Sequence, residues 1–128
     1  MTLTRKKTDR QKLIAKCDKL ASEIVRRRAV IRLGGCERCL TQHPWQELQC
    51  CHFVTRTIFN TRWDIDDNLA GLCAGCHRYL DRNPFEKIDW WTGRVGPDKV
   101  DLLRWNPYHG KADLEWVEVY LRQQLESL

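Results

Sequence analysis

Four of the seven cysteines stand in two pairs with the same spacing, Cys36-Glu-Arg-Cys39 and Cys73-Ala-Gly-Cys76. Each pair can offer two thiolates from one tight turn, and a structural zinc ion takes four ligands in a tetrahedron. Free core cysteines and a redox-active pair are the alternatives, but a redox pair belongs in a thioredoxin-like strand–helix–strand setting that this sequence lacks. We therefore predict one structural zinc ion held by these four thiolates.

A second set of polar side chains, most of which can move a proton or bind a metal, lies between and just after the cysteine pairs. Its members are Cys51, His52, Asn68, His77 and Asp81. A neutral imidazole accepts a proton near pH 7, so a histidine in this set suits general-base chemistry. His77 and Asp81 stand four residues apart and share one face of the helix that we expect over Leu69–Asp81.

The order and spacing of these pieces resemble the HNH, or ββα-metal, nuclease superfamily. The matching segments are Leu48–Phe53 for the first strand, Asp67–Leu69 for the second and Leu72–His77 for the helix. The resemblance covers residues 36–82. Within the superfamily, this segment is similar to small phage-encoded HNH proteins, to the lambdoid NinG/Rap recombination proteins and to resolvases of the endonuclease VII type. It implies a ββα-metal core that hydrolyses phosphodiester bonds in DNA, in a protein encoded by a phage and acting in its bacterial host.

The resemblance also implies a role for each polar residue. His52 is then the general base, His77 a ligand of the catalytic metal, and Asn68 the brace of the loop that carries His52. The catalytic ion would be Mg²⁺, Mn²⁺ or another transition metal.

Two positions depart from the family pattern. Cys51 stands where the family often has Asp or His as a metal ligand, and a thiolate suits zinc or another transition metal better than Mg²⁺. In a regular strand Cys51 and His52 also point to opposite faces, so both reach one ion only if the backbone bends. Asp81 stands where a second helical His is common, and it can supply an oxygen ligand instead.

Basic residues concentrate near the N-terminus. Residues 1–32 carry 11 Lys/Arg and 3 Asp/Glu, whereas residues 33–128 carry 11 Lys/Arg and 14 Asp/Glu. A basic arm on a mildly acidic body favours a polyanionic partner, which we take to be DNA, and a solvated helix face is the alternative. The candidates for phosphate binding are Arg26, Arg27, Arg28, Arg56 and Arg62.

The arm itself predicts one long helix from Thr8 to Leu33. Thr8 can cap its start, and Gly34-Gly35 ends it. Apolar side chains recur along it at helical spacing, at Leu13, Cys17, Leu20, Ile24 and Ile31. This stripe could also form the interface of a homodimer.

Shorter elements are expected further along the chain. A strand or hairpin arm falls within Leu48–Arg56, and a polar turn covers Asn60–Asn68. Asn83-Pro84 opens a helix that runs to Trp91. The chain then continues through a link over Thr92–Pro97, a helical piece to Trp105, a break at Asn106-Pro107 and a last helix from Asp113.

These expectations describe an α+β chain, mainly helical, in which helices flank a small HNH core with its four-cysteine zinc. Residues 1–35 form the basic helix, residues 36–82 the zinc-stapled nuclease core, and residues 83–128 a helical extension that packs on the core. No stretch approaches 18 apolar residues, and the first residues lack a secretory apolar segment, so we expect a cytoplasmic protein with no membrane contact.

Two functions remain open at this stage. The first is a metal-dependent HNH endonuclease that nicks DNA, cuts both strands or cleaves branched DNA. The second is a non-catalytic, zinc-containing accessory protein that binds nucleic acid in phage recombination or regulation. The presence of His52, Asn68 and His77 together favours the enzyme, while Cys51 keeps the accessory protein open.

Overall fold

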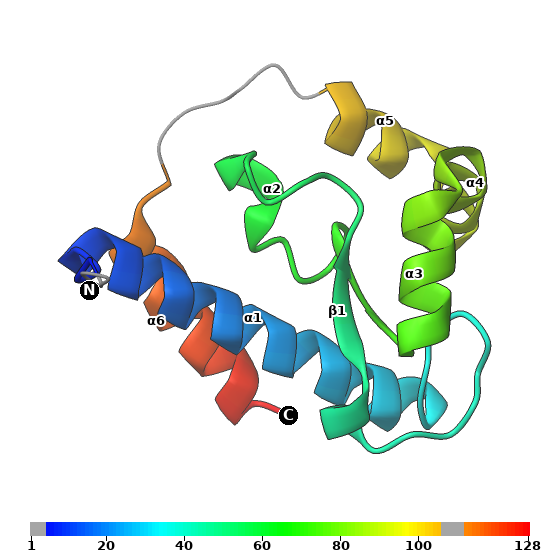
Figure 1. The fold of residues 1–128 in the computed structure, drawn as a ribbon, viewed down its shortest axis with the longest axis horizontal. Helices are drawn as coiled ribbons and strands as arrows, with labels where there is room; N and C mark the ends of the chain where they lie inside the picture. The colour runs from blue at the N-terminus through cyan, green and yellow to red at the C-terminus, as the bar shows by residue number, and fades with distance from the viewer. Residues whose placement is uncertain (1–4, 106–111) are drawn as a thin grey trace, which may run out of the picture.

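The computed structural model describes residues 5–105 and 112–128, and the break expected at Asn106-Pro107 lies outside them. Within these residues the chain forms six α-helices and one two-stranded sheet (Figure 1). The protein is therefore α+β and mainly helical, as its sequence predicts. No helix in these two ranges has both the length and the apolar character that crossing a membrane requires.

Helix α1 covers Asp9–Leu33 and confirms the long N-terminal helix. The Thr8 hydroxyl accepts a hydrogen bond from the Gln11 amide at 3.1 Å, and the Gln11 side chain accepts one from the Thr8 amide at 2.9 Å. Gly34 ends the helix with φ 81°, a left-handed conformation that glycine adopts without strain. The buried side chains of α1 are Cys17, Ala21, Ile24, Val25 and Ala29.

One member of the expected apolar stripe lies outside this buried face. Ile31 is 65% exposed, so its assignment to the stripe is wrong. Ala29 stands two residues earlier, on nearly the opposite side of the helix, and it is Ala29 that faces the sheet.

The sheet pairs β1 (Gln49–His52) with β2 (Leu69–Leu72) in antiparallel register, with His52 opposite Leu69. A helix beginning at Leu69 is therefore wrong in its first four residues, all of which are buried. Gly71 lets β2 cross α1 closely, because a Cβ there would lie 2.9 Å from the Ala29 Cβ. Helix α3 covers Ala74–Arg82.

The remaining helices also differ in extent from the sequence-based expectation. A short helix α2 (Phe59–Arg62) lies inside the segment expected to be a polar turn. Helix α4 (Pro84–Val95) continues past Trp91, so the expected link shrinks to Gly96 before α5 (Pro97–Trp105). The last helix, α6, covers Leu114–Glu126, and the Asp113 carboxylate caps it by accepting from the Trp116 amide at 3.2 Å.

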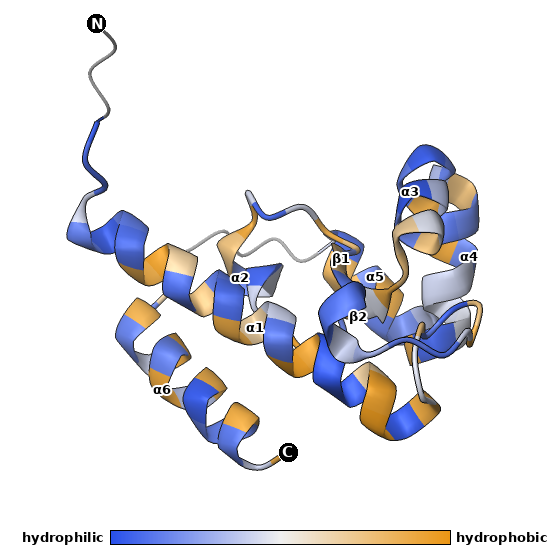
Figure 2. Cartoon of the chain, turned by 60° about the horizontal axis from the view of Figure 1, so that its bottom comes forward, coloured by the Kyte–Doolittle hydropathy of each residue, from blue (hydrophilic) through white to orange (hydrophobic). Residues whose placement is uncertain are grey.

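The apolar residues form two clusters that divide the C-terminal extension. Helices α4 and α5 pack with the strands and α3, where Trp91 is fully buried and stacks on Phe53 with ring centroids 5.3 Å apart. Helix α6 instead runs along α1, and Leu114 and Leu121 pack against Cys17 and Ile24. The two helices lie side by side in Figures 1 and 2. The apolar stripe of α1 is thus covered by α6 and β2 of the same chain.

Candidate metal and active site

The four cysteines of the two CxxC pairs come together in one cluster. Their sulfur atoms all lie within 4.8 Å of one another, and Cys39 Sγ is 3.8 Å from Cys73 Sγ. Zinc–sulfur bonds of about 2.3 Å in a tetrahedron place the sulfurs about 3.8 Å apart. The cluster therefore fits a metal ion such as zinc, as the spacing of the cysteines predicts.

Local backbone structure builds this cage. On one side the chain turns tightly, and the Cys36 carbonyl accepts from the Leu40 amide at 3.0 Å. On the other side Cys73 is the N-cap of α3, and its sulfur accepts from the Cys76 amide at 3.4 Å. Amide groups at a helix start stabilise a thiolate.

The interior side of the cage is closed to water. Burial raises the pKa of the Cys76 thiol to about 12, so this thiol stays neutral at pH 7 unless a metal ion binds it. The Arg38 guanidinium donates to Cys76 Sγ at 3.4 Å, which supports negative charge on the sulfur.

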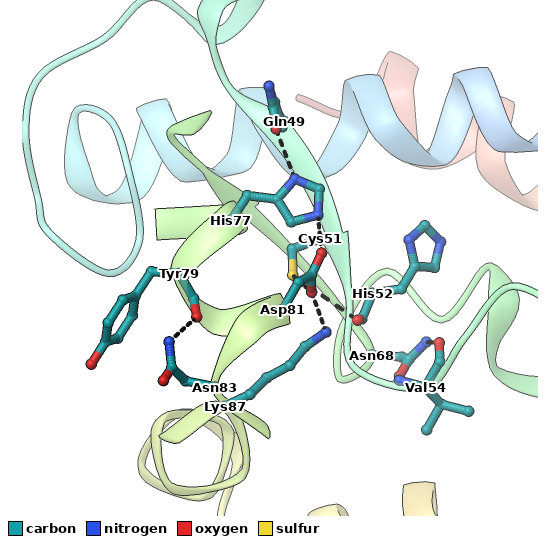
Figure 3. A network of polar contacts seen from close by, with 10 residues as sticks. All are labelled: Gln49, Cys51, His52, Val54, Asn68, His77, Tyr79, Asp81, Asn83 and Lys87. Carbon is teal, nitrogen blue, oxygen red and sulfur yellow. Dashed lines mark hydrogen bonds and ion pairs between the residues drawn. The ribbon is translucent and has the colours of Figure 1, made fainter. Parts of the chain in front are cut away.

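A second candidate cluster brings together Cys51, His77 and Asp81, whose ligand atoms also lie within 4.8 Å of one another (Figure 3). His77 Nε2 is 3.1 Å from Asp81 Oδ2, and Cys51 Sγ is 4.0 Å from Asp81 Oδ1. Gln49, at the start of β1, places its side-chain oxygen 2.8 Å from His77 Nδ1. The strand and α3 thus fix both ends of the His77 ring.

This arrangement fits a metal ion. If Gln49 accepts the Nδ1 proton, the lone pair of His77 Nε2 faces the Asp81 oxygen, and a proton or a cation must lie between them. Two ligand atoms that each lie about 2.1 Å from one ion, with a ligand–ion–ligand angle of about 95°, are about 3.1 Å apart. This matches the 3.1 Å between His77 Nε2 and Asp81 Oδ2. Burial raises the pKa of the Cys51 thiol to about 12. Only a thiophilic ion displaces such a proton readily, so the three donors suit a transition metal better than Mg²⁺.

His52 leaves β1 on the opposite side from Cys51 (Figure 3), as strand alternation requires. Burial, followed by the positive charge of Arg56, lowers the pKa of His52 to about 4. The ring is therefore neutral at pH 7, which is the protonation state that a general base requires.

An open cleft extends from His52 to the second candidate cluster, where it reaches His77 and Asp81. It has a volume of about 650 Å³ and is lined in part by His52, Arg56, His77, Asp81 and Lys87. The base candidate and the two surface-accessible ligand candidates thus face one space of a size that admits a phosphodiester group.

Asn68 is fully buried just behind the His52 loop. Its side-chain oxygen accepts from the Val54 amide at 2.8 Å, and its nitrogen donates to the carbonyls of Val54 at 3.2 Å and Thr61 at 3.0 Å. These three bonds tie the chain after β1 to α2. The brace that the family resemblance implies for Asn68 is thus compatible with its contacts.

The arginines expected to bind phosphate differ in their surroundings. Arg62 holds the Asp18 carboxylate with two bonds of 2.9 and 2.6 Å, and Arg28 pairs with Asp66 at 2.8 Å. Arg26 and Arg27 lie over the Trp45 ring, 4.9 and 4.8 Å from its centroid.

Arg56 is the member of this group that lines the cleft; its side chain is 61% exposed and lies 3.7 Å from the Asp18 carboxylate. Further exposed basic side chains lie just before and at the start of α1, on Arg5, Lys6, Lys7, Arg10 and Lys12.

Three residues in and around the cleft escaped the sequence reasoning, namely Lys87, Asp18 and Gln49. Asp18 carries a visible signal, because it is one of only three acidic residues in the mainly basic α1 and stands beside the buried Cys17. Gln49 and Lys87 carry none, since the packing of α3 against β1 and α4 is what brings Gln49 to His77 and Lys87 to the cleft.

The chain matches no family model, no curated protein and no solved structure among those compared. A functional assignment therefore rests on the residues and geometry of the site.

Proposed function

We propose that this protein is a metal-dependent endonuclease of the HNH type that hydrolyses phosphodiester bonds in DNA. One observation carries the proposal. The neutral His52 lines the same cleft as the His77–Asp81 pair, and the buried Asn68 ties down the loop that follows His52. The nearby four-cysteine cluster supports it, because a zinc there would fix the turn before β1 to the start of α3.

Each residue then has a definable task in hydrolysis. His52 accepts the proton of the attacking water, because its ring is unprotonated throughout the neutral range. Arg56 neutralises a non-bridging phosphate oxygen. His77 and Asp81, with Cys51 behind them, would hold a divalent cation that stabilises charge on the phosphate and on the leaving oxygen. Asn68 keeps the His52 loop in place.

A non-catalytic zinc protein that binds nucleic acid is the second candidate, and one contact favours it. Lys87 Nζ lies 2.7 Å from Asp81 Oδ1, so an ammonium group already neutralises one of the proposed metal ligands. If that ion pair were permanent, the cleft would bind phosphate without cutting it.

The deciding experiment incubates the protein with supercoiled plasmid and with a four-way DNA junction in Mg²⁺, Mn²⁺, Ni²⁺ or Zn²⁺. We expect metal-dependent cleavage that falls by about two to four orders of magnitude in His52→Ala, the usual loss for a positioned base. His43→Ala is the matched control, because His43 pairs with Glu47 in the loop before β1 and does not line the cleft.

Zinc content and DNA affinity should survive in both variants, since neither histidine belongs to the cage. Cleavage by His52→Ala at the wild-type rate would contradict the mechanism. DNA binding without cleavage in any of the four metals would favour the non-catalytic candidate.

A further inference from the structure

Lys87 reaches the cleft from outside the HNH-like segment. Asn83-Pro84 turns the chain between α3 and α4, and the Asn83 amide donates to the Leu80 carbonyl at 3.2 Å. The turn brings Lys87 back over Asp81, where Nζ lies 2.7 Å from Oδ1. The Lys87 side chain is only 15% exposed, and Figure 3 shows it extending to Asp81.

The two carboxylate oxygens of Asp81 contact different groups. Oδ1 accepts from Lys87 at 2.7 Å, and Oδ2 lies 3.1 Å from His77 Nε2. A divalent cation held by His77 and Asp81 would therefore sit within a few ångströms of the Lys87 ammonium. Repulsion between the two charges lowers the affinity for the cation in this partly buried position.

If Asp81 instead bound a divalent cation, the Lys87 ammonium would lose its anionic partner. Among the described residues, Asp81 provides the one carboxylate within ion-pair distance of Lys87. An anionic partner stabilises an ammonium group whose side chain is largely buried. The cleft that Lys87 lines also carries Arg56, so the anion best suited to replace Asp81 there is a phosphate group.

We propose that Lys87 couples substrate binding to metal binding. In the free protein its ammonium neutralises Asp81 and keeps the affinity for a divalent cation low. A DNA phosphate that enters the cleft replaces Asp81 as the ion-pair partner of the Lys87 ammonium, and Asp81 becomes fully available to the cation. This proposal rests on the proposed function, because it requires the Cys51–His77–Asp81 cluster to be a metal site.

The test measures Mn²⁺ binding rather than cleavage. Mn²⁺ affinity is determined by electron paramagnetic resonance of the free ion, on zinc-loaded protein in a His52→Ala background that leaves DNA uncut. Lys87→Met should bind Mn²⁺ at least tenfold more tightly, because the repelling charge is gone. Lys87→Arg keeps the charge and should stay within about threefold of the parent chain.

Lys99→Met is the matched control, because Lys99 pairs with Asp67 at 3.3 Å, is 57% exposed and does not line the cleft. Its Mn²⁺ affinity should change less than twofold. A short duplex should tighten Mn²⁺ binding to the parent chain, and by linkage Mn²⁺ should tighten duplex binding by the same factor. In Lys87→Met this coupling should shrink at least threefold.

The outcomes separate the two proposals. Unchanged or weaker Mn²⁺ binding by Lys87→Met, in a chain that binds Mn²⁺ through Asp81, would overturn the role of Lys87 and leave the metal site standing. Equal binding by the parent chain and by Asp81→Ala would overturn the metal site itself, and the role of Lys87 with it.

Discussion

Replacing Asn68 by alanine tests the brace on the His52 loop without reference to catalysis. The substitution removes three side-chain hydrogen bonds, to the Val54 amide, the Val54 carbonyl and the Thr61 carbonyl. Each bond contributes about 1 kcal/mol, and buried partners left unpaired add to the loss. We therefore expect the free energy of unfolding to fall by about 3 kcal/mol in Asn68→Ala.

Asn83→Ala provides the matched control for this prediction. Asn83 also donates its side-chain nitrogen to a carbonyl, that of Tyr79 at 2.7 Å, but this bond is open to solvent. Water replaces such a bond, so the free energy of unfolding should fall by less than about 1 kcal/mol. Asn68→Asp keeps the size of the side chain but turns an oxygen toward two carbonyls, and it should be at least as damaging as alanine.

Urea denaturation at pH 7 with zinc present measures all three variants. Equal losses in Asn68→Ala and Asn83→Ala would show that the Asn68 bonds do not hold the loop. If the brace serves catalysis, Asn68→Ala should also cleave DNA far more slowly under conditions where it remains folded.

Three further predictions follow from the structure. Cys73→Ser should remove tightly bound zinc and sharply lower the free energy of unfolding, whereas Cys17→Ser should keep the zinc; equal zinc loss in both would contradict the cage. Burial lowers the pKa of His52 from 6.5 to about 4. In protein without a catalytic metal, therefore, the unfolded chain binds this proton more strongly than the folded chain between pH 4 and 6.5, and this histidine makes the free energy of unfolding rise with pH over that range. In His52→Gln that rise should be less steep than in the wild type. Replacing the exposed Lys6, Lys7 and Lys12 by glutamine should make the slope of log affinity against log salt shallower by about 2.7 on duplex DNA, and an unchanged slope would mean that this end of α1 does not contact phosphate.

Local patterns in the sequence were enough to predict several features. The capping residues Thr8 and Gly34 bound α1 because capping depends on neighbouring residues alone. The two CxxC pairs predict the cysteine cluster for a similar reason, since each pair needs only a tight turn to present two sulfurs. Asp113 likewise marks the start of α6.

Features that depend on distant partners were not predictable in this way. Leu69–Leu72 is short and apolar, so its pattern fits either the start of a helix or a buried strand, and only its pairing with β1 decides. Arg62 looked available to phosphate because its partner, Asp18, lies 44 residues earlier in the chain. The division of the C-terminal extension between two clusters depends on which helix each apolar face meets.

The basic N-terminal region illustrates the same limit. Its net charge predicts contact with a polyanion, but the sequence does not tell which of its side chains are free. Arg26, Arg27 and Arg28 contact Trp45 or Asp66, and the surrounding turns of α1 are part of the core. Figure 2 shows that the beginning of α1 is hydrophilic, so contact with nucleic acid is expected there and not at the arginine run.

The two cysteine-containing clusters differ in a way that would suit a bound metal ion to different roles. The first offers four sulfurs and can complete a tetrahedron from protein ligands alone, and such closed sites hold structure together. The second offers three donors and, through His77 and Asp81, lines an open cleft, so water or a phosphate can take the remaining positions. Cys51 restricts which metal ions can bind at this second site, because its buried thiol must lose a proton before the sulfur can bind an ion. A carboxylate at position 51 would remove that requirement, so Cys51→Asp should shift the metal preference of cleavage from thiophilic ions toward Mg²⁺. If Cys51 does not reach the metal, the same substitution buries an unpaired charge and should instead destabilise the fold without changing the preference.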